Sequence, residues 1–256
     1  MIKRFYIFVL LLLIAFPLYS QKWKLTRYEA IVGIGTANYY GDIGGGNSEN
    51  NLLGLKDVFS WNSIRNTGPC IYFGGRYKLQ QDRAIKVNLI YGYFRDDDKG
   101  SINAQRDYSF RTHAIEPSVQ YEYYFIQEER RKFSFAAFNR RGMMNNISKI
   151  GVYAFGGLGG VVYFAKFFNN YNPAVETVNT NKHITIAIPI GLGIKYIYSS
   201  EMAFGFELGR RYLTTDYFDG FTSKYSKYND IYLFGVFNVV YRLRTDRNGY
   251  PVFRRW

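Results

Sequence analysis

The sequence predicts an all-β protein, an eight-stranded antiparallel transmembrane β-barrel with long extracellular loops and one enlarged periplasmic connection. The first observation is the segment His183 to Tyr198, in which the even-numbered residues from Ile184 to Tyr198 are aliphatic or aromatic while the odd-numbered ones from Thr185 to Lys195 are small or polar. Strand side chains alternate between two faces, so one face here is apolar over its whole length. The apolar face is longer than ordinary strands provide and matches the roughly 9 to 11 residues of a tilted membrane-crossing strand.

The second observation is that such segments recur. In each of them one parity is consistently apolar, and an even count of eight suits a single-chain outer-membrane barrel. The expected strands are Tyr28 to Asn38, Cys70 to Leu79, Ala84 to Phe94, Phe110 to Phe125, Ile150 to Phe164, His183 to Tyr198, Met202 to Leu213, and Ile231 to Leu243.

The third observation is the beginning of the chain. Lys3 and Arg4 precede an apolar run that extends from Phe5 to Leu18, and Ser20 offers a small-residue cleavage point. We therefore expect residues 1–20 to be a signal peptide and residues 21–256 to form one barrel domain. An exported chain with repeated alternating segments belongs in the outer membrane, because lipid admits only helices and closed barrels.

The lengths of the connections predict the orientation. Short turns of outer-membrane barrels face the periplasm and long loops face outward, which places both termini in the periplasm. One connection, about 126–149, is on the periplasmic side yet is long, and the C-terminal tail, about 244–256, lies on the same side. We interpret residues 126–149 as a periplasmic insertion.

The insertion is basic, and its bases are the partner-binding residues that we predict. The chain has a net charge of +13, whereas the expected outer loops carry slightly more acids than bases, so the positive excess should lie in the lumen and on the periplasmic rim. Such a surface suits an acidic or anionic partner; contact with outer-membrane lipid phosphates is the simpler alternative. Bases scattered between membrane strands do not favour nucleic acid. The predicted partner-binding residues are Arg130, Arg131, Lys132, Arg140 and Arg141.

The inward parity collects polar and charged side chains. The interior of an eight-stranded barrel is just wide enough to be filled by side chains, and buried charges persist only when paired. We therefore expect a plug of ion pairs and hydrogen bonds in place of a pore, too narrow for protein export. The residues are Arg76, Lys78, Lys86, Asn88, Glu116, Gln120, Glu122, Lys195, Glu207, Arg211, Asn238 and Arg242.

Reactive residues are few, and we expect no enzyme activity, no cofactor and no metal. The two histidines, His113 and His183, lie near the outer ends of their expected strands, and Ser101 and Ser109 are the nearest candidate nucleophiles to His113 in the sequence. A nucleophile needs a base within hydrogen-bond reach, which nothing here ensures. A lipid-modifying enzyme nevertheless stays an alternative.

Other acids fit structural roles better than ligand sites. The single cysteine, Cys70, allows no disulfide framework, and the run from Asp96 to Asp98 lacks the spacing of a calcium loop, so we expect a solvated turn. Asp readily bonds nearby backbone in turns. The residues expected to tie the outer loops together are Gly41, Asp42, Asp216 and Asp219.

Five segments together resemble a family of small Bacteroidetes outer-membrane barrels, of the DUF6089 type, that includes the barrel subunit of the type IX secretion machinery. The segments are NYYGDIGG from Asn38, GGRYKLQQDRAIKVNLIYGYFRDDD from Gly74, RDYSFRTHAIEPSVQYEYYF from Arg106, YAFGGLGG from Tyr153 and TTDYFDGF from Thr214.

The resemblance implies a non-enzymatic accessory or anchoring role in type IX protein secretion. The partner it implies is a periplasmic ring built from a lipoprotein and its partner protein, while cargo leaves through a different, larger barrel. A general porin-like or adhesive barrel is a further alternative, and no ring-contact residue is carried over by resemblance.

Overall fold

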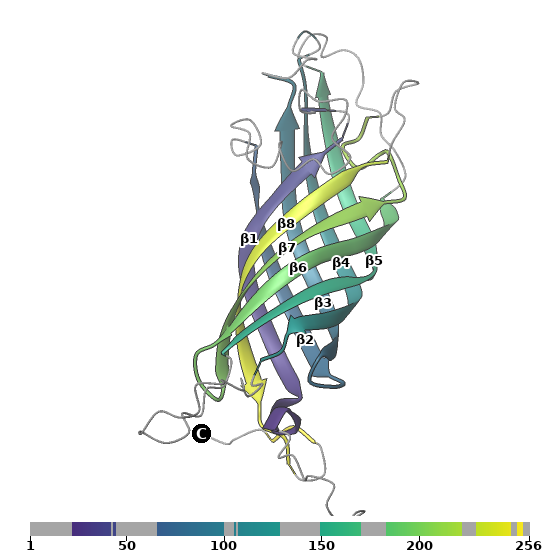
Figure 1. The fold of residues 1–256 in the computed structure, drawn as a ribbon. Helices are drawn as coiled ribbons and strands as arrows, with labels where there is room; N and C mark the ends of the chain where they lie inside the picture. Colours follow the sequence, from purple (N-terminus) through teal and green to yellow (C-terminus); the bar gives the residue numbers. More distant parts are fainter. Residues whose placement is uncertain are drawn as a thin grey trace, which may run out of the picture.

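The computed structural model describes residues 22–41, 43–44, 66–99, 105, 107–128, 149–169, 183–221, 229–246 and 250–252. In these residues eight strands follow one another around a closed barrel, each hydrogen-bonded to its neighbours in the sequence, and β8 closes on β1 (Figure 1). A short 3-10 helix, η1 (Lys22–Thr26), precedes the first strand. The strands are β1 (Tyr28–Tyr40), β2 (Gly68–Lys78), β3 (Arg83–Asp97), β4 (Tyr108–Ile126), β5 (Ile150–Asn169), β6 (Ile184–Ile197), β7 (Met202–Leu213) and β8 (Ile231–Leu243).

The predicted fold class is confirmed. The bounds of β7 and β8 are those expected from the sequence, and the largest differences lie in β3 and β5, which run on past their predicted C-terminal ends. All pairings are antiparallel, and the β1–β8 closure extends without interruption from Tyr28↔Leu243 to Tyr40↔Ile231. Within the closed ring no strand edge is left unpaired, as hydrocarbon surroundings require.

The two faces of the wall separate apolar from polar residues. Outward side chains such as Ile34, Leu192 and Phe237 are 60–70% exposed, whereas inward charged ones such as Arg76 and Lys86 are buried. This inverted arrangement is that of a protein whose outer solvent is lipid, so the chain is an outer-membrane-type transmembrane β-barrel. Leu233 departs from the pattern: it has outward parity but is buried, between Asn38 of β1 and Arg210 of β7 in the ladder. No helix among the described residues is long and apolar enough to cross a membrane.

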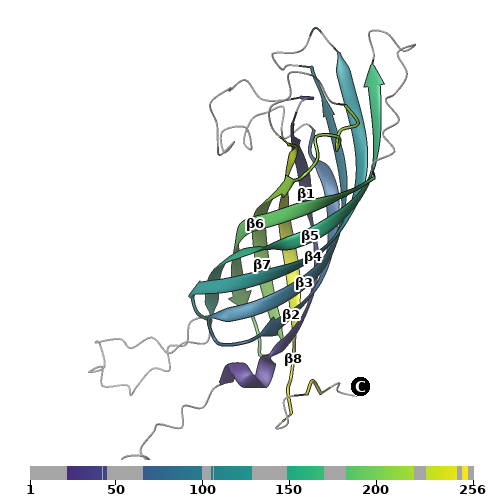
Figure 2. The ribbon, with the colours of Figure 1, turned by 90° about the vertical axis from the view of Figure 1, so that its right-hand side faces the viewer.

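The barrel has two different ends. The terminal end carries η1, the C-terminal residues, and the turns that join β2 to β3 and β6 to β7; the loop end carries the other ends of the strands (Figure 1). At the loop end β3, β4 and β5 project beyond the ring, as Figure 2 shows. The last ladder pairs that tie this group to its neighbours are Cys70↔Gly92 and Val162↔Ile184. The projection is therefore a three-stranded sheet on one side of the barrel mouth.

Candidate functional site

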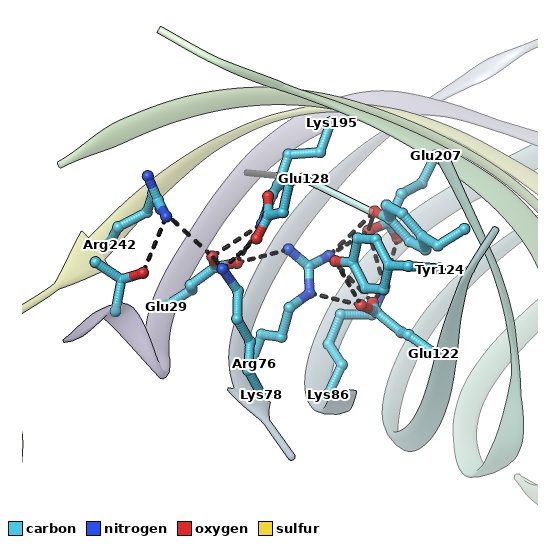
Figure 3. Close-up of polar contacts among 12 residues, drawn as sticks. Glu29, Arg76, Lys78, Lys86, Glu122, Tyr124, Glu128, Lys195, Glu207 and Arg242 are labelled. Carbon is cyan, nitrogen blue, oxygen red and sulfur yellow. Dashed lines mark hydrogen bonds and ion pairs between the residues drawn. The ribbon is translucent and has the colours of Figure 1, made fainter. Parts of the chain in front are cut away.

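The half of the lumen near the terminal end is filled by ion pairs (Figure 3). One group surrounds Glu29 of β1, whose carboxylate lies 2.9 Å from Lys78 Nζ and 2.8 Å from Lys195 Nζ. Arg242 Nε lies 3.8 Å from the same carboxylate, and Arg242 also donates to the Thr26 hydroxyl of η1. Strands β1, β2, β6 and β8 are thereby joined across the interior.

A second group lies deeper in the barrel. Lys86 Nζ is 2.9 Å from Glu122 and 2.7 Å from Glu207, and Glu207 also accepts a hydrogen bond from the Tyr153 hydroxyl. Arg76 connects the two groups, because its guanidinium contacts Glu29 at 2.9 Å, Glu122 at 2.7 Å and Glu207 at 3.4 Å. One buried side chain thus pairs with carboxylates from three strands, and the lumen is blocked at this level.

Glu128 extends this network outside the strands. It lies two residues past the end of β4, next to a register shift between Tyr124 and Ile126, and its side chain turns into the lumen to pair with Lys78 and Lys195. Its backbone oxygen also accepts from Gln81 in the β2–β3 turn. The start of the long β4–β5 connection is therefore fastened to the barrel interior.

All twelve residues predicted to fill the lumen are buried, but two acids of the network, Glu29 and Glu128, were not predicted. Glu29 was missed because the inward-facing positions that follow it in β1, from Ile31 to Ala37, are all apolar or glycine, so the pattern gave no sign of a polar lumen there. Glu128 was counted with the connection, because nothing local indicates that a residue after a strand folds back into the lumen. The predicted lumen residues include more bases than acids. Because buried charges need partners, this imbalance was the signal that acidic side chains from other parts of the chain also lie in the lumen.

The charge balance of the lumen corrects one expectation. Among the described residues six lumen bases face five acids, so the lumen is almost neutral and does not hold the positive excess of the chain. The bases are Arg76, Lys78, Lys86, Lys195, Arg211 and Arg242, and the acids are Glu29, Glu116, Glu122, Glu128 and Glu207. Pairing of this kind is what burial requires, so the positive excess of the chain lies outside the described lumen.

The loop-end half of the lumen is closed by aromatic rings. Phe218, in the loop between β7 and β8, is fully buried and packs against Phe94, Tyr163 and Tyr232, with ring centroids 5.0–5.4 Å apart. Its backbone oxygen accepts from the Thr112 hydroxyl at 2.8 Å. The loop thus folds into the mouth, with Phe218 as a stopper above the ion pairs.

Two carboxylates hold this loop in place. The Tyr39 hydroxyl of β1 lies 2.9 Å from a carboxylate oxygen of Asp219 and within hydrogen-bond distance of Asp230, and Asp230 accepts from the Phe218 backbone N–H. Burial, and next the charge of Asp219, raise the pKa of the Asp230 carboxyl well above its ordinary range. Of the residues predicted to tie the loops together, Asp219 is thus fully buried against β1, Gly41 lies at the end of that strand, Asp216 is half-buried, and Asp42 lies outside the described residues.

The acidic run at the end of β3 also differs from expectation. Asp98 is buried and accepts from the backbone N–H groups of Gly44 and Tyr108, and Asp96 accepts from the Asn66 side chain. The prediction of a solvated turn was therefore wrong, because the carboxylates of Asp96 and Asp98 accept hydrogen bonds from neighbouring segments of the chain. No cluster of metal-ligating side chains is present among the described residues.

The candidate catalytic residues are not brought together. His113 faces outward, with Nδ1 2.8 Å from the Tyr91 hydroxyl, and His183 stacks on Phe164. Ser109 is on the same strand as His113, four residues away, which is about 13 Å along an extended chain. Ser101 lies outside the described residues, as do the predicted partner-binding bases Arg130, Arg131, Lys132, Arg140 and Arg141 and the signal peptide.

Comparison with models of known protein families identifies the family of this chain. The family model DUF6089, "Domain of unknown function", matches residues 3–241. The chain belongs to the DUF6089 family. No curated protein matches this DUF6089 chain.

Among solved structures, the DUF6089 barrel is similar to the N-terminal β-barrel domain of Pseudomonas aeruginosa OprF, at 11% identity and a TM-score of 0.39, over 84% of this chain and 97% of that one. It is similar to Ail of Yersinia pestis, at 10% identity and a TM-score of 0.42, over 84% and 99% of the two chains. It is also similar to outer membrane protein W of E. coli, at 15% identity and a TM-score of 0.39, over 85% and 98%.

Proposed function

We propose that the protein is a non-enzymatic outer-membrane barrel that acts as an accessory or anchoring component of the type IX secretion machinery and docks a periplasmic ring through its periplasmic face. The observation that carries this proposal is the double closure of the lumen, by the Arg76 ion pairs in one half and by Phe218 in the other. A filled barrel cannot conduct cargo, so its function lies at its ends.

The terminal end is the better candidate for docking. The resemblance of the five sequence segments to the secretion-system barrel implies that the partner is the periplasmic ring. The short turns of the terminal end favour an orientation in which this end faces the periplasm. Glu128, held by Lys78 and Lys195, fixes the first residues of the basic connection to the rigid barrel. A binding segment whose root is immobilised loses less conformational freedom on association, which favours affinity.

An affinity pull-down tests the proposal. The full-length protein is solubilised from its native membrane in mild detergent, and co-purifying proteins are quantified by mass spectrometry for the wild type and for a variant in which Arg130, Arg131, Lys132, Arg140 and Arg141 are changed to Gln. We expect the wild type to recover the periplasmic lipoprotein and its ring partner, and the variant to recover much less.

The matched control neutralises five bases of the loop end, Arg95, Lys99, Arg111, Lys166 and Arg210, which removes the same charge from the opposite end. Ring recovery should survive this change. Equal recovery by both variants, or no ring components with the wild type, would refute docking through the insertion. A deletion strain that secretes its cargo and assembles rings normally would refute the role in secretion.

The alternative of a lipid-modifying enzyme has its own test. His113→Ala and His183→Ala remove the two imidazoles, which pack against the rings of Tyr93 and Phe164 respectively. If the protein is non-enzymatic, the membrane lipid A profile of each variant strain will equal that of the wild type; a missing acyl modification in either strain would favour the enzyme.

A further inference from the structure

Three basic side chains occupy adjacent register positions on the outer wall of the β3–β4–β5 projection. Arg95 of β3 pairs with Arg111 of β4, and Arg111 pairs with Lys166 of β5, and all three are exposed. Directly paired strand residues have Cβ atoms about 4.5–5.5 Å apart, and like charges placed opposite each other are destabilising. A row of three bases therefore favours an anion placed between them.

The row lies at a defined depth in the wall. Two residues closer to the barrel, a ladder of rings crosses the same strands: Tyr93 pairs with His113, and His113 pairs with Phe164, which stacks on His183 at 5.7 Å. Aromatic rings of this kind mark the boundary between hydrocarbon and headgroups. The three bases, about 6.6 Å farther along the strands, are consequently at the level of lipid headgroups.

An aromatic ring and an open depression adjoin the row of bases. The Arg111 guanidinium lies over the Phe168 ring at 5.6 Å, which holds its planar head close to the wall. Arg95 and Arg111 line an open depression together with Asn66, Ser109 and Phe168. Asp96 and Asp97 also line the depression, and Asp96 is engaged by the Asn66 side chain and the Asp97 backbone N–H. Lys166 does not line it but occupies the next register position beside Arg111, so the row as a whole carries three bases against these two carboxylates.

We propose that Arg95, Arg111 and Lys166 bind the phosphate group of a membrane lipid in the loop-end leaflet. Arginine offers forked donors that match phosphate oxygens, lysine adds a point charge, and the aromatic ladder below accommodates the acyl chains. Each base near an anionic lipid surface contributes about fivefold to affinity. The site does not depend on the ring partner and is on the opposite end of the barrel.

The test uses the purified full-length protein in neutral detergent and two probes: lipid A with its phosphates, and the same lipid A after their enzymatic removal. Native mass spectrometry measures the bound fraction of each lipid for the wild type and for the variant Arg95→Gln, Arg111→Gln, Lys166→Gln. The matched control is Arg83→Gln, Lys149→Gln, Arg244→Gln, which removes three exposed bases at the terminal end.

We expect the wild type and the control to prefer the phosphorylated lipid, and the loop-end variant to lose about 100-fold in affinity for it with no change toward the dephosphorylated lipid. Heat-modified gel mobility verifies that each variant is folded, and Arg111→Gln alone, with an expected loss of about fivefold, replaces a triple variant that fails this check. Equal binding of the two lipids by the wild type, or undiminished binding by a folded loop-end variant, would overturn the proposal.

Discussion

Lys195 Nζ lies 2.7 Å from a carboxylate oxygen of Glu128, so a residue that follows β4 is paired inside the lumen with a residue of β6. Lys78 of β2 pairs with the same carboxylate. Three separate parts of the wall therefore meet at the root of the β4–β5 connection. This contact joins the two features on which the proposed function rests, the filled lumen and the basic insertion.

Glu128→Gln should destabilise the barrel. The change leaves two buried ammonium groups with Glu29 as their remaining carboxylate partner, and breaking a buried ion pair costs roughly 3–5 kcal/mol in unfolding free energy. Urea unfolding of protein refolded into lipid vesicles, followed by far-ultraviolet circular dichroism, measures this loss. The control is Glu201→Gln, which removes the half-buried surface partner of the exposed Arg244 and should cost less than about 1 kcal/mol. Equal losses for the two variants would contradict the buried role of Glu128.

The stability of the wild type should fall in acid through Glu128. Burial opposes the ionised form, but Lys195 and Lys78 outweigh it and lower the pKa of this carboxyl to about 2 from its ordinary 4.5. A lowered pKa stabilises the folded state above pH 4.5, and this contribution disappears as the pH falls toward about 2. Urea midpoints measured across this range should decline less steeply in Glu128→Gln than in the wild type. Parallel profiles would show that Glu128 does not titrate in this way.

Asp230→Asn should change stability with the opposite dependence on pH. Because the pKa of this carboxyl is raised by burial and by Asp219, its ionised form is disfavoured in the folded loop. The folded state therefore loses stability as the pH rises above the ordinary carboxyl pKa and through the raised one. Between pH 5 and pH 8 the unfolding midpoint of the wild type should decrease more than that of Asp230→Asn. A steeper decrease in the variant would contradict this assignment.

Phe218→Ala should loosen the stopper without unfolding the barrel wall. Loss of a fully buried phenylalanine costs about 3–5 kcal/mol, since the cavity among Phe94, Tyr163 and Tyr232 cannot collapse between rigid strands. Limited proteolysis within the β7–β8 loop should become much faster, while cleavage elsewhere stays the same. The neighbouring half-buried residue gives the control, Tyr217→Ala, for which we expect a smaller effect. Unchanged cleavage in Phe218→Ala would show that the loop is not held by its stopper.

Strand positions and the filled lumen were predictable because a barrel wall imposes a period of two over long segments. His183 to Tyr198 shows this period so clearly that the strand was placed to within one residue at each end. The contributions of Glu128 and Phe218 were not predictable, because both belong to connections, where alternation ends. Their positions depend on which lumen space the strands leave unfilled, and that is a property of the closed barrel and not of a local pattern.

The β3–β4–β5 projection shows a second limit. Arg95 and Lys166 are charged residues at positions where an apolar, lipid-facing side chain is expected, so the predicted strands end before them. In the structure, hydrogen bonding to β4 continues β3 and β5 beyond these residues. The strands therefore extend past the hydrocarbon boundary, where charged side chains are stable. The two bases that shortened the predicted strands, Arg95 and Lys166, both belong to the proposed phosphate site.

Single-channel recording in planar lipid bilayers tests most directly whether this barrel is closed. The full-length protein, refolded and verified by its heat-modified gel mobility, is inserted into bilayers, with a porin under the same conditions as the positive control. Because Arg76 and its carboxylates fill one half of the lumen and Phe218 fills the other, we predict a current equal to that of the protein-free bilayer. Reproducible stepwise openings of the wild-type protein would contradict a closed lumen, and with it an anchor whose function lies at its ends.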